Sequence, residues 1–297
     1  MEASMATLAP RTFYGLLQNG WKRSLICVGL DPDLDLFPAH LKKKHTCDIG
    51  AMIEDFNSQI IDATKEYVCA YKMNWAQYLA YGTVGVHALQ RTIERIRIYA
   101  PDAVVILDAK PGDGDNTNKF YVRAAFDELK ADAVTVNPYM GGYETFAPFL
   151  ERKDKGVIFL CKSSNPDSGV IQDLKVGKDT VYMKVAKNVM AWNKNANCGL
   201  VVGATHPTAL EKIRRYIGNS MPILSPGVGR QGGDAELAVR VGKDAFGTGI
   251  FISSSTGVTY ASKGEDFAEK AKVNLLQLVA ETASGLTTPR RRPAKQK

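Results

Sequence analysis

Short runs of β-branched and other apolar residues alternate along the chain with longer stretches whose apolar residues recur at helical spacing, and we count this pair eight times. The short runs are typical of buried strands, and the longer stretches are typical of helices packed on one face. Predicted strands cover residues 24–30, 68–73, 103–109, 133–136, 157–161, 200–203, 222–224 and 245–252. Predicted helices cover residues 49–65, 84–99, 118–130, 178–193, 208–217, 235–241 and 266–283, and one further helix ends at residue 150.

Strands separated by helices indicate parallel β-α-β units, and eight such units are the number found in a (β/α)₈ barrel. We therefore predict an α/β fold, with a single (β/α)₈ TIM barrel over residues 1–285. An open, doubly wound sheet is the alternative, but the turn Leu30-Asp31-Pro32-Asp33 after the first strand lacks the glycine fingerprint of such sheets. Residues 286–297 can bury almost nothing, and we expect a short disordered basic tail or a linker there.

Charge and cysteine content narrow the classes of function. The net charge of +7 would suit a nucleic-acid surface, but five basic residues lie in the predicted tail and leave about +2 for the body, so we expect no nucleic-acid partner. The five cysteines form no C-x-x-C pair, which argues against a disulfide or zinc framework. No apolar run reaches about 18 residues and the start lacks a secretory signal, which predicts an intracellular, cytoplasmic protein with no membrane partner.

The clearest candidate for chemistry is the stretch from Val104 to Thr117, where an apolar strand ends in an Asp-x-Lys-x-x-Asp cluster. Positions two apart on a strand project to the same side, so we expect Asp108 and Lys110 to point together into the space at the strand's end. Asp113 follows in the loop. Two carboxylates and an ammonium are expensive to bury without a purpose, although a solvated surface loop with a local salt bridge is the alternative.

Polar residues also follow other predicted strands, as an active site at the carboxyl ends of barrel strands requires. The loop at 225–234, after the seventh strand, is dense in glycine. Glycines let backbone N–H groups approach an anion, and barrels commonly bind phosphate at this position, although a plain turn is the alternative. The polar residues at or after strand ends are Asp31, Lys72, Asn74, Ser163, Ser164, Gln231, Ser253, Ser254, Ser255 and Thr256.

No residue pattern points to a metal ion or to a catalytic nucleophile. The four histidines lack paired spacing and are expected to be surface or structural residues. No serine or cysteine stands in an elbow motif. Trp75 and Tyr78, close to Lys72, are expected to pack rather than to stack on a base. The sequence therefore predicts no metal site.

Together these residues resemble the orotidine 5′-monophosphate decarboxylase family over nearly the whole body, from Cys27 to about Ala271. The Asp-x-Lys-x-x-Asp signature alone is shared with sugar-phosphate decarboxylases and aldolases of related barrels. The other motifs make the set far more specific. They are Val28-Gly29-Leu30-Asp31-Pro32, Lys72-Met73-Asn74, Thr135-Val136-Asn137-Pro138-Tyr139, Ser164-Asn165-Pro166 and the glycine loop from Pro226 to Gly233.

The resemblance implies a cofactor-free conversion of orotidine monophosphate to uridine monophosphate, a step of pyrimidine biosynthesis, in a barrel that works as a homodimer. It implies that Lys110 delivers a proton to pyrimidine C6 and that Asp108 lies beside the departing CO₂. Lys72 would hold both Asp108 and the ribose. Asp113, which would also flank the carboxylate, and Thr117 match positions that the neighbouring subunit lends to the site.

The same resemblance implies how the nucleotide is bound. Asp31 would bind a ribose hydroxyl, Ser164 would read the pyrimidine edge, and Gln231 would bridge base and phosphate. The other binding residues that it implies are Asn74, Gly229, Arg230, Ser255 and Gly257.

One position departs from the family pattern. The family usually has an arginine for the phosphate in a Ser-Ser-Arg-Gly turn after the eighth strand, whereas this chain has Thr256 there, and threonine supplies no cation. Our hypothesis is that Arg230, in the glycine loop, approaches the phosphate from the other side.

Two other functions stay open at this point. One is a metal-assisted sugar-phosphate decarboxylase or synthase of the same barrel group, and the other is a catalytically silent nucleotide-binding barrel, an alternative that Thr256 keeps open. This decarboxylase is fused to orotate phosphoribosyltransferase in some organisms, so such a domain could follow the basic segment in a longer chain. A specialised organelle such as the glycosome is an alternative to the cytoplasm.

Overall fold

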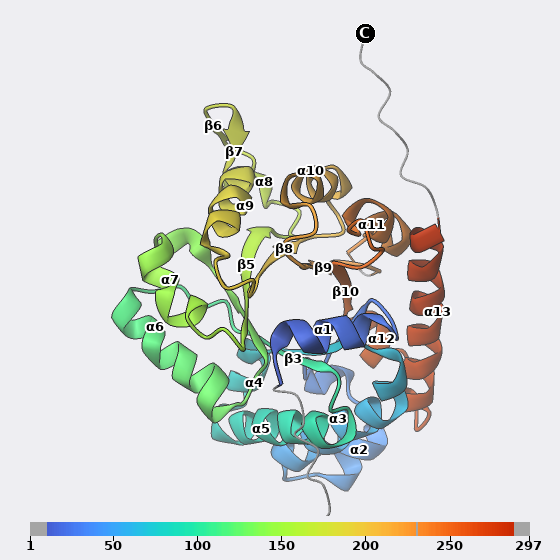
Figure 1. The fold of residues 1–297 in the computed structure, drawn as a ribbon. Coiled ribbons are helices and arrows are strands. Elements are labelled where there is room, and N and C mark those ends of the chain that lie inside the picture. Colours follow the sequence, from blue (N-terminus) through green and yellow to red (C-terminus); the bar gives the residue numbers. More distant parts are fainter. Residues whose placement is uncertain (1–10, 230, 288–297) are drawn as a thin grey trace, which may run out of the picture.

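Eight parallel strands form a closed barrel in the computed structural model, which describes residues 11–229 and 231–287 (Figure 1). The barrel strands are β1 (Ile26–Gly29), β2 (Ala70–Asn74), β3 (Val104–Asp108), β4 (Ala133–Val136), β5 (Gly156–Lys162), β8 (Cys198–Val202), β9 (Ile223–Pro226) and β10 (Ile250–Ser254). Each strand pairs with the next barrel strand along the chain, and β10 pairs with β1. The predicted (β/α)₈ barrel is confirmed.

The helices form a ring around the barrel in Figure 1, and they bury apolar faces against it. In α3, for example, Ile53, Phe56 and Ile60 recur at helical spacing and are almost completely buried. The longer helices are α3 (Ile49–Thr64), α5 (Gly82–Tyr99), α6 (Asp115–Val122), α7 (Tyr143–Leu150), α9 (Val181–Trp192), α10 (Pro207–Ile217), α11 (Ala235–Gly242) and α13 (Phe267–Thr287). Shorter elements are η1 (Leu34–Leu36), α2 (Ala39–Lys44), η2 (Lys65–Tyr67), α4 (Trp75–Leu79), the π-helix η3 (Arg123–Glu128), η4 (Pro138–Met140), α8 (Gly169–Gln172) and α12 (Thr256–Thr259).

An N-terminal helix that we did not predict, α1 (Phe13–Trp21), lies across one end of the barrel in Figure 1. Its Phe13 and Leu17 are buried against the barrel's interior side chains. Arg11, just before this helix, forms a 2.6 Å ion pair with Asp132, which directly precedes β4. The helix therefore closes the end at which the strands begin and leaves the opposite end for the site.

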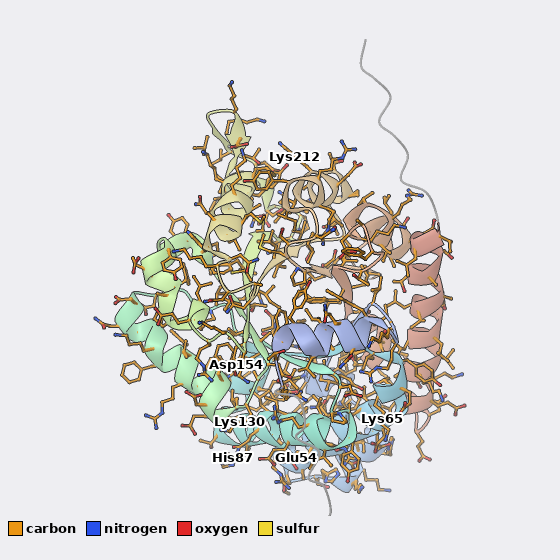
Figure 2. The ribbon with its side chains drawn as sticks, in the orientation of Figure 1. Glu54, Lys65, His87, Lys130, Asp154 and Lys212 are labelled. Carbon is orange, nitrogen blue, oxygen red and sulfur yellow. The ribbon has the colours of Figure 1, made fainter. Side chains whose placement is uncertain are left out.

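Charged side chains cover the outside of the helical ring, as Figure 2 shows for Glu54, Lys130 and Lys212. His87, labelled in the same view, is exposed on α5, which agrees with the prediction that the histidines are surface or structural residues. Among the described residues, no helix is long and apolar enough to cross a membrane.

Several predicted elements differ from the structure at their ends, and three of the differences are informative. The helix predicted from residue 178 begins at Val181, because a small hairpin of β6 (Lys175–Val176) and β7 (Asp179–Thr180) precedes it, with Gly177 in the left-handed region at φ 63°. The strand predicted from residue 245 begins at Ile250, since the Asp244 carboxylate accepts from two backbone N–H groups and forms a turn. The helix α13 ends at Thr287, two residues beyond the predicted body, and residues 288–297 of the predicted tail lie outside the described part.

Candidate active site

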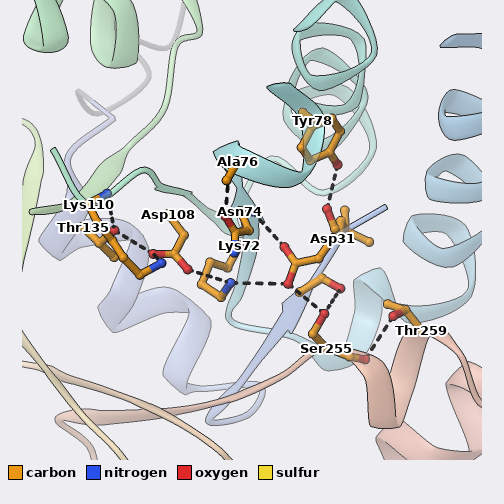
Figure 3. A network of polar contacts seen from close by, with 12 residues as sticks. Asp31, Lys72, Asn74, Ala76, Tyr78, Asp108, Lys110, Thr135, Ser255 and Thr259 are labelled. Atoms are coloured by element: carbon orange, nitrogen blue, oxygen red, sulfur yellow. Dashed lines mark hydrogen bonds and ion pairs between the residues drawn. The ribbon is translucent and has the colours of Figure 1, made fainter. Parts of the chain in front are cut away.

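Four charged side chains form a row of alternating sign at the carboxyl ends of β1, β2 and β3 (Figure 3). The Lys72 ammonium lies 3.6 Å from Oδ2 of Asp31 and 3.1 Å from Oδ2 of Asp108. The Lys110 ammonium donates to the other oxygen of Asp108 at 2.7 Å. We call Asp31, Lys72, Asp108 and Lys110 the charged array. The structure thus places Asp108 and Lys110 together at the barrel mouth, as predicted.

Opposite charges keep Lys72 and Asp108 in their charged forms although both side chains are largely buried. Burial alone would raise the pKa of Asp108, but Lys72 and Lys110 outweigh that effect and hold the pKa well below its usual range. Burial alone would lower the pKa of Lys72, whereas the carboxylates of Asp31 and Asp108 raise it above its ordinary value. The attraction within a buried ion pair offsets the cost of removing its charges from water only when its geometry is good and its other hydrogen bonds are satisfied. The charged array meets that condition.

The conformation of Lys110 differs from the one that we expected. The strand β3 ends at Asp108, so Lys110 lies beyond the pleat, with a backbone φ of 53° in the left-handed region. Its N–H donates to the carbonyl oxygen of Thr135 at 3.0 Å, which holds this turn in place. A left-handed turn, rather than strand alternation, therefore brings the Lys110 ammonium back to Asp108, and such backbone strain is common at functional sites.

Thr135 is a site residue that sequence reasoning missed. It lies in β4, is almost completely buried, and its hydroxyl donates to Oδ1 of Asp108 at 2.7 Å. The same hydroxyl accepts from the Lys110 N–H at 3.2 Å. The available signal was a lone hydroxyl near the carboxyl end of an otherwise apolar strand, within a motif already noted for the family.

Asp31 is fixed by hydrogen bonds to both of its oxygens. The Asn74 N–H donates to Oδ1 at 2.8 Å, and the Ser255 hydroxyl donates to Oδ2 at 2.8 Å. The Tyr260 hydroxyl donates to the Asp31 carbonyl at 2.7 Å. The Asn74 side chain accepts from the Ala76 N–H and caps α4, so this predicted binding residue has a structural task as well (Figure 3).

A cavity of about 450 Å³ extends from Lys72, the member of the charged array that lines it, to the glycine loop and the turn after β10. This places the predicted base reader Ser164 and the predicted bridge Gln231 on the same cavity as Lys72. The glycine loop therefore lies across from the charged array, as the sequence predicted. The residues that line the cavity are Lys72, Ser164, Pro226, Gly227, Val228, Gln231, Ser253, Ser255, Thr256 and Gly257.

Gly227 allows Ser164 and Gln231 to lie close to its backbone at the wall of the cavity. Its φ is 93°, in the left-handed region that favours glycine, and a Cβ there would lie 2.8 Å from both Cβ of Ser164 and Oε1 of Gln231. The glycine is thus required by backbone conformation and by the close approach of Ser164 and Gln231.

Three predicted site residues, among those that the structure describes, neither line this cavity nor contact the charged array. Asp113 is half-buried and its carboxylate accepts from the Gly114 N–H, and no hydrogen bond or ion pair among the described residues joins it to the charged array. Thr117 is exposed on α6. Gly229 lines a neighbouring cavity of about 400 Å³, together with Gly257. Arg230 lies outside the described residues.

Comparison with known proteins decides the family. Residues 24–271 match the model of the orotidine 5′-phosphate decarboxylase / HUMPS family, which is more than half of the chain. The chain belongs to this family. The predicted resemblance is confirmed, and so is the prediction of a carbon–carbon lyase of this kind.

Relatives of the family match over nearly the full chain. An orotidine 5′-phosphate decarboxylase of Azoarcus is 44% identical over 268 residues, which are 89% of this chain and 96% of that protein. The structure of Leishmania donovani OMP decarboxylase superposes with a TM-score of 0.80 at 33% identity, covering 93% of this chain and all of the other. Leishmania donovani UMP synthase matches with a TM-score of 0.78 at 36% identity, covering 91% of this chain and 57% of the other.

Among the described residues, no group of three or more His, Cys, Asp or Glu side chains is arranged to hold a metal ion. All five cysteines are free, and four of them are buried.

Proposed function

We propose that this cavity converts orotidine 5′-monophosphate to uridine 5′-monophosphate without a cofactor, with Lys110 as the acid. The observation that carries the proposal is a cavity that has Lys72, ion-paired with Asp108 of the charged array, at one end and a glycine loop at the other. A phosphate at the glycine loop would leave the pyrimidine ring near the Asp108 and Lys110 side chains.

The chemistry requires a cation at a defined place. Breaking the bond between C6 and the carboxylate carbon releases CO₂ and leaves an electron pair on C6, in the plane of the ring. The Lys110 ammonium, held at 2.7 Å from Asp108, is prepositioned to stabilise that charge and to donate its proton to C6. Asp108 lies beside the departing CO₂ in this proposal, and its contact with the Lys110 ammonium holds that group in place for the transfer.

One ammonium does not account for the whole rate enhancement. Enzymes lower barriers by about 8–23 kcal/mol, and the upper part of that range needs binding energy from parts of the substrate far from the reacting bond. In our proposal Asp31 and Lys72 bind the ribose, Ser164 reads the base, and Gln231 bridges base and phosphate. The Asp31 carboxylate accepts from Asn74 and Ser255 and keeps lone pairs for a ribose hydroxyl.

The phosphate would be held by the glycine loop and by the turn from Ser255 to Gly257, because both line the far end of the cavity. Thr256 supplies a hydroxyl there but no charge. We propose Arg230 as the compensating cation, since it directly follows Gly229 in the same loop.

We further propose a homodimer in which Asp113 and Thr117 complete the partner's site. Two features support it. No hydrogen bond or ion pair among the described residues joins the Asp113 carboxylate to the charged array of its own chain, and the side chains of Phe120 (73%) and Tyr139 (83%) are exposed. Mixing inactive Lys110→Ala with inactive Asp113→Asn, under conditions of subunit exchange, should restore about a quarter of the sites. No restoration would contradict shared sites.

The main test is the loss of orotidine monophosphate absorbance on addition of protein, with and without EDTA. We expect full activity in EDTA and no turnover by Lys110→Ala with its fold intact. Sensitivity to the chelator would favour the metal-assisted sugar-phosphate enzyme, whereas binding of nucleotide without turnover would favour the silent barrel. A fused orotate phosphoribosyltransferase domain and the compartment, cytoplasm or a glycosome-like organelle, stay predictions.

A further inference from the structure

An ion pair between a buried lysine and a half-exposed aspartate closes the base of the segment that carries Ser164. Lys162, the last residue of β5, is 2% exposed, and its ammonium donates to Oδ1 of Asp173 at 2.9 Å. Asp173 directly follows α8 and is half exposed. The chain leaves the barrel at Lys162, passes Ser164 and returns to Asp173, so the ion pair joins the two ends of this excursion (Figure 1).

Two hydrogen bonds between Ser163 and Gln172, the chain neighbours of the paired residues, reinforce the ion pair. Oε1 of Gln172 accepts from the Ser163 N–H at 3.0 Å, and its Nε2 donates to the Ser163 hydroxyl at 3.4 Å. Residues 162 and 173, and then 163 and 172, are thus bonded in succession. We call Lys162, Ser163, Gln172 and Asp173 the clasp.

The middle of the segment is fixed from the other side, by the loop between β8 and α10. The Thr205 hydroxyl donates to the carbonyl oxygen of Ser164 at 3.3 Å. Nε2 of His206 lies 3.2 Å from the Ser168 hydroxyl. Gly203 allows the backbone to approach closely, since a Cβ there would lie 2.7 Å from Cα of Ser164. Ser164 is therefore held from both sides at the wall of the cavity.

The clasp takes no part in the proposed chemistry, yet it contains a buried ammonium. Lys162 lies outside the charged array. Its ammonium also lies 6.0 Å from the centre of the Tyr182 ring. Removing the carboxylate partner of a buried ammonium leaves an uncompensated charge and destabilises the structure around it. A movement of the clasp would reach Ser164 first, because Ser163 is one of its members.

We propose that the clasp positions Ser164 for recognition of the pyrimidine base, so that Lys162, Gln172 and Asp173 set the affinity of the site for the base. This inference rests on the proposed function, in which Ser164 reads the base edge. Lys162, Gln172 and Asp173 are positioning residues, since none of them lines the cavity.

The test compares ligands with and without a base. Asp173→Asn keeps the shape of the half-exposed side chain but removes its charge. We expect its affinity for uridine monophosphate to fall about tenfold, while its affinity for ribose 5-phosphate stays within about twofold, both measured by calorimetry. Asp173→Glu should restore most of the nucleotide affinity. The matched control is Asp179→Asn, which breaks a similar 2.7 Å contact with Lys187 on the same projecting part of the chain, away from Ser164.

Each outcome is decisive. If Asp173→Asn binds the nucleotide as tightly as wild type, the proposed role of the clasp is refuted. It is also refuted if Asp173→Asn loses as much affinity for ribose 5-phosphate as for the nucleotide, or if Asp179→Asn loses nucleotide affinity. Either of these two results would mean that the clasp residues have a merely structural role. If Asp173→Asn does not fold, Gln172→Ala removes the second pair of contacts and must give the same selective loss. Wild-type protein that neither binds uridine monophosphate nor consumes orotidine monophosphate would instead refute the proposed function.

Discussion

Thr135→Val tests how the charged array is held, because it removes one hydroxyl and keeps the side chain's shape. The hydroxyl donates to Asp108 at 2.7 Å and accepts from the Lys110 N–H, so valine removes one hydrogen bond from each group. Asp108 keeps its contacts with Lys72 and Lys110, and the Lys110 N–H keeps the Thr135 carbonyl oxygen as its acceptor. A hydrogen bond to a charged group contributes about 1.5–3 kcal/mol. At about 1.36 kcal/mol for each factor of ten, we expect kcat/KM for orotidine monophosphate to fall about 10- to 150-fold.

A second threonine provides the control for this experiment. Thr64 in α3 is fully buried, and its hydroxyl donates to the Ile60 carbonyl at 2.6 Å, away from the cavity. Thr64→Val should lower the free energy of unfolding by about 1 kcal/mol, measured in urea, and leave kcat/KM unchanged. If Thr135→Val instead retains wild-type kcat/KM while losing as much stability as the control, Thr135 supports the fold and not the array.

Three further predictions concern the array and the phosphate end. The pKa of Asp108 is lower in the folded protein than in the unfolded chain, so its ion pairs stabilise the fold fully above about pH 4. That stabilisation is lost as the pH falls toward the folded pKa. The Tm of Asp108→Asn should therefore fall less than the Tm of the wild type when the pH is lowered through this range. Arg230→Ala should raise KM at least tenfold if it compensates for Thr256, and an unchanged KM would refute compensation. Gly227→Ala should abolish nucleotide binding, whereas Gly218→Ala, at φ 55° with open space around it, should affect stability alone.

The sequence was sufficient for the barrel and for most of the cavity, since each buried strand is a short apolar run and the polar residues that matter directly follow those runs. It was not sufficient for α1, whose role at the closed end of the barrel depends on a surface that the whole barrel creates. Thr135 was missed for a similar reason. The β3–β4 register, with Leu107 opposite Val134, brings Thr135 beside Asp108, and strand pairing is not encoded in either strand alone.

The meeting of Asp108 and Lys110 shows how a correct prediction can rest on the wrong cause. The pleat predicts that residues two apart share a side, but Lys110 lies beyond the end of β3, in a left-handed conformation stabilised by the backbone of β4. A non-glycine residue pays about 1–3 kcal/mol for such a conformation, so the surrounding structure must overdetermine it. Lys110 therefore depends on β4 for its backbone and on Asp108 for its ammonium, which couples the position of the proposed acid to the pairing of two strands. A change that shifts β4 relative to β3 should then displace the acid before it opens the barrel.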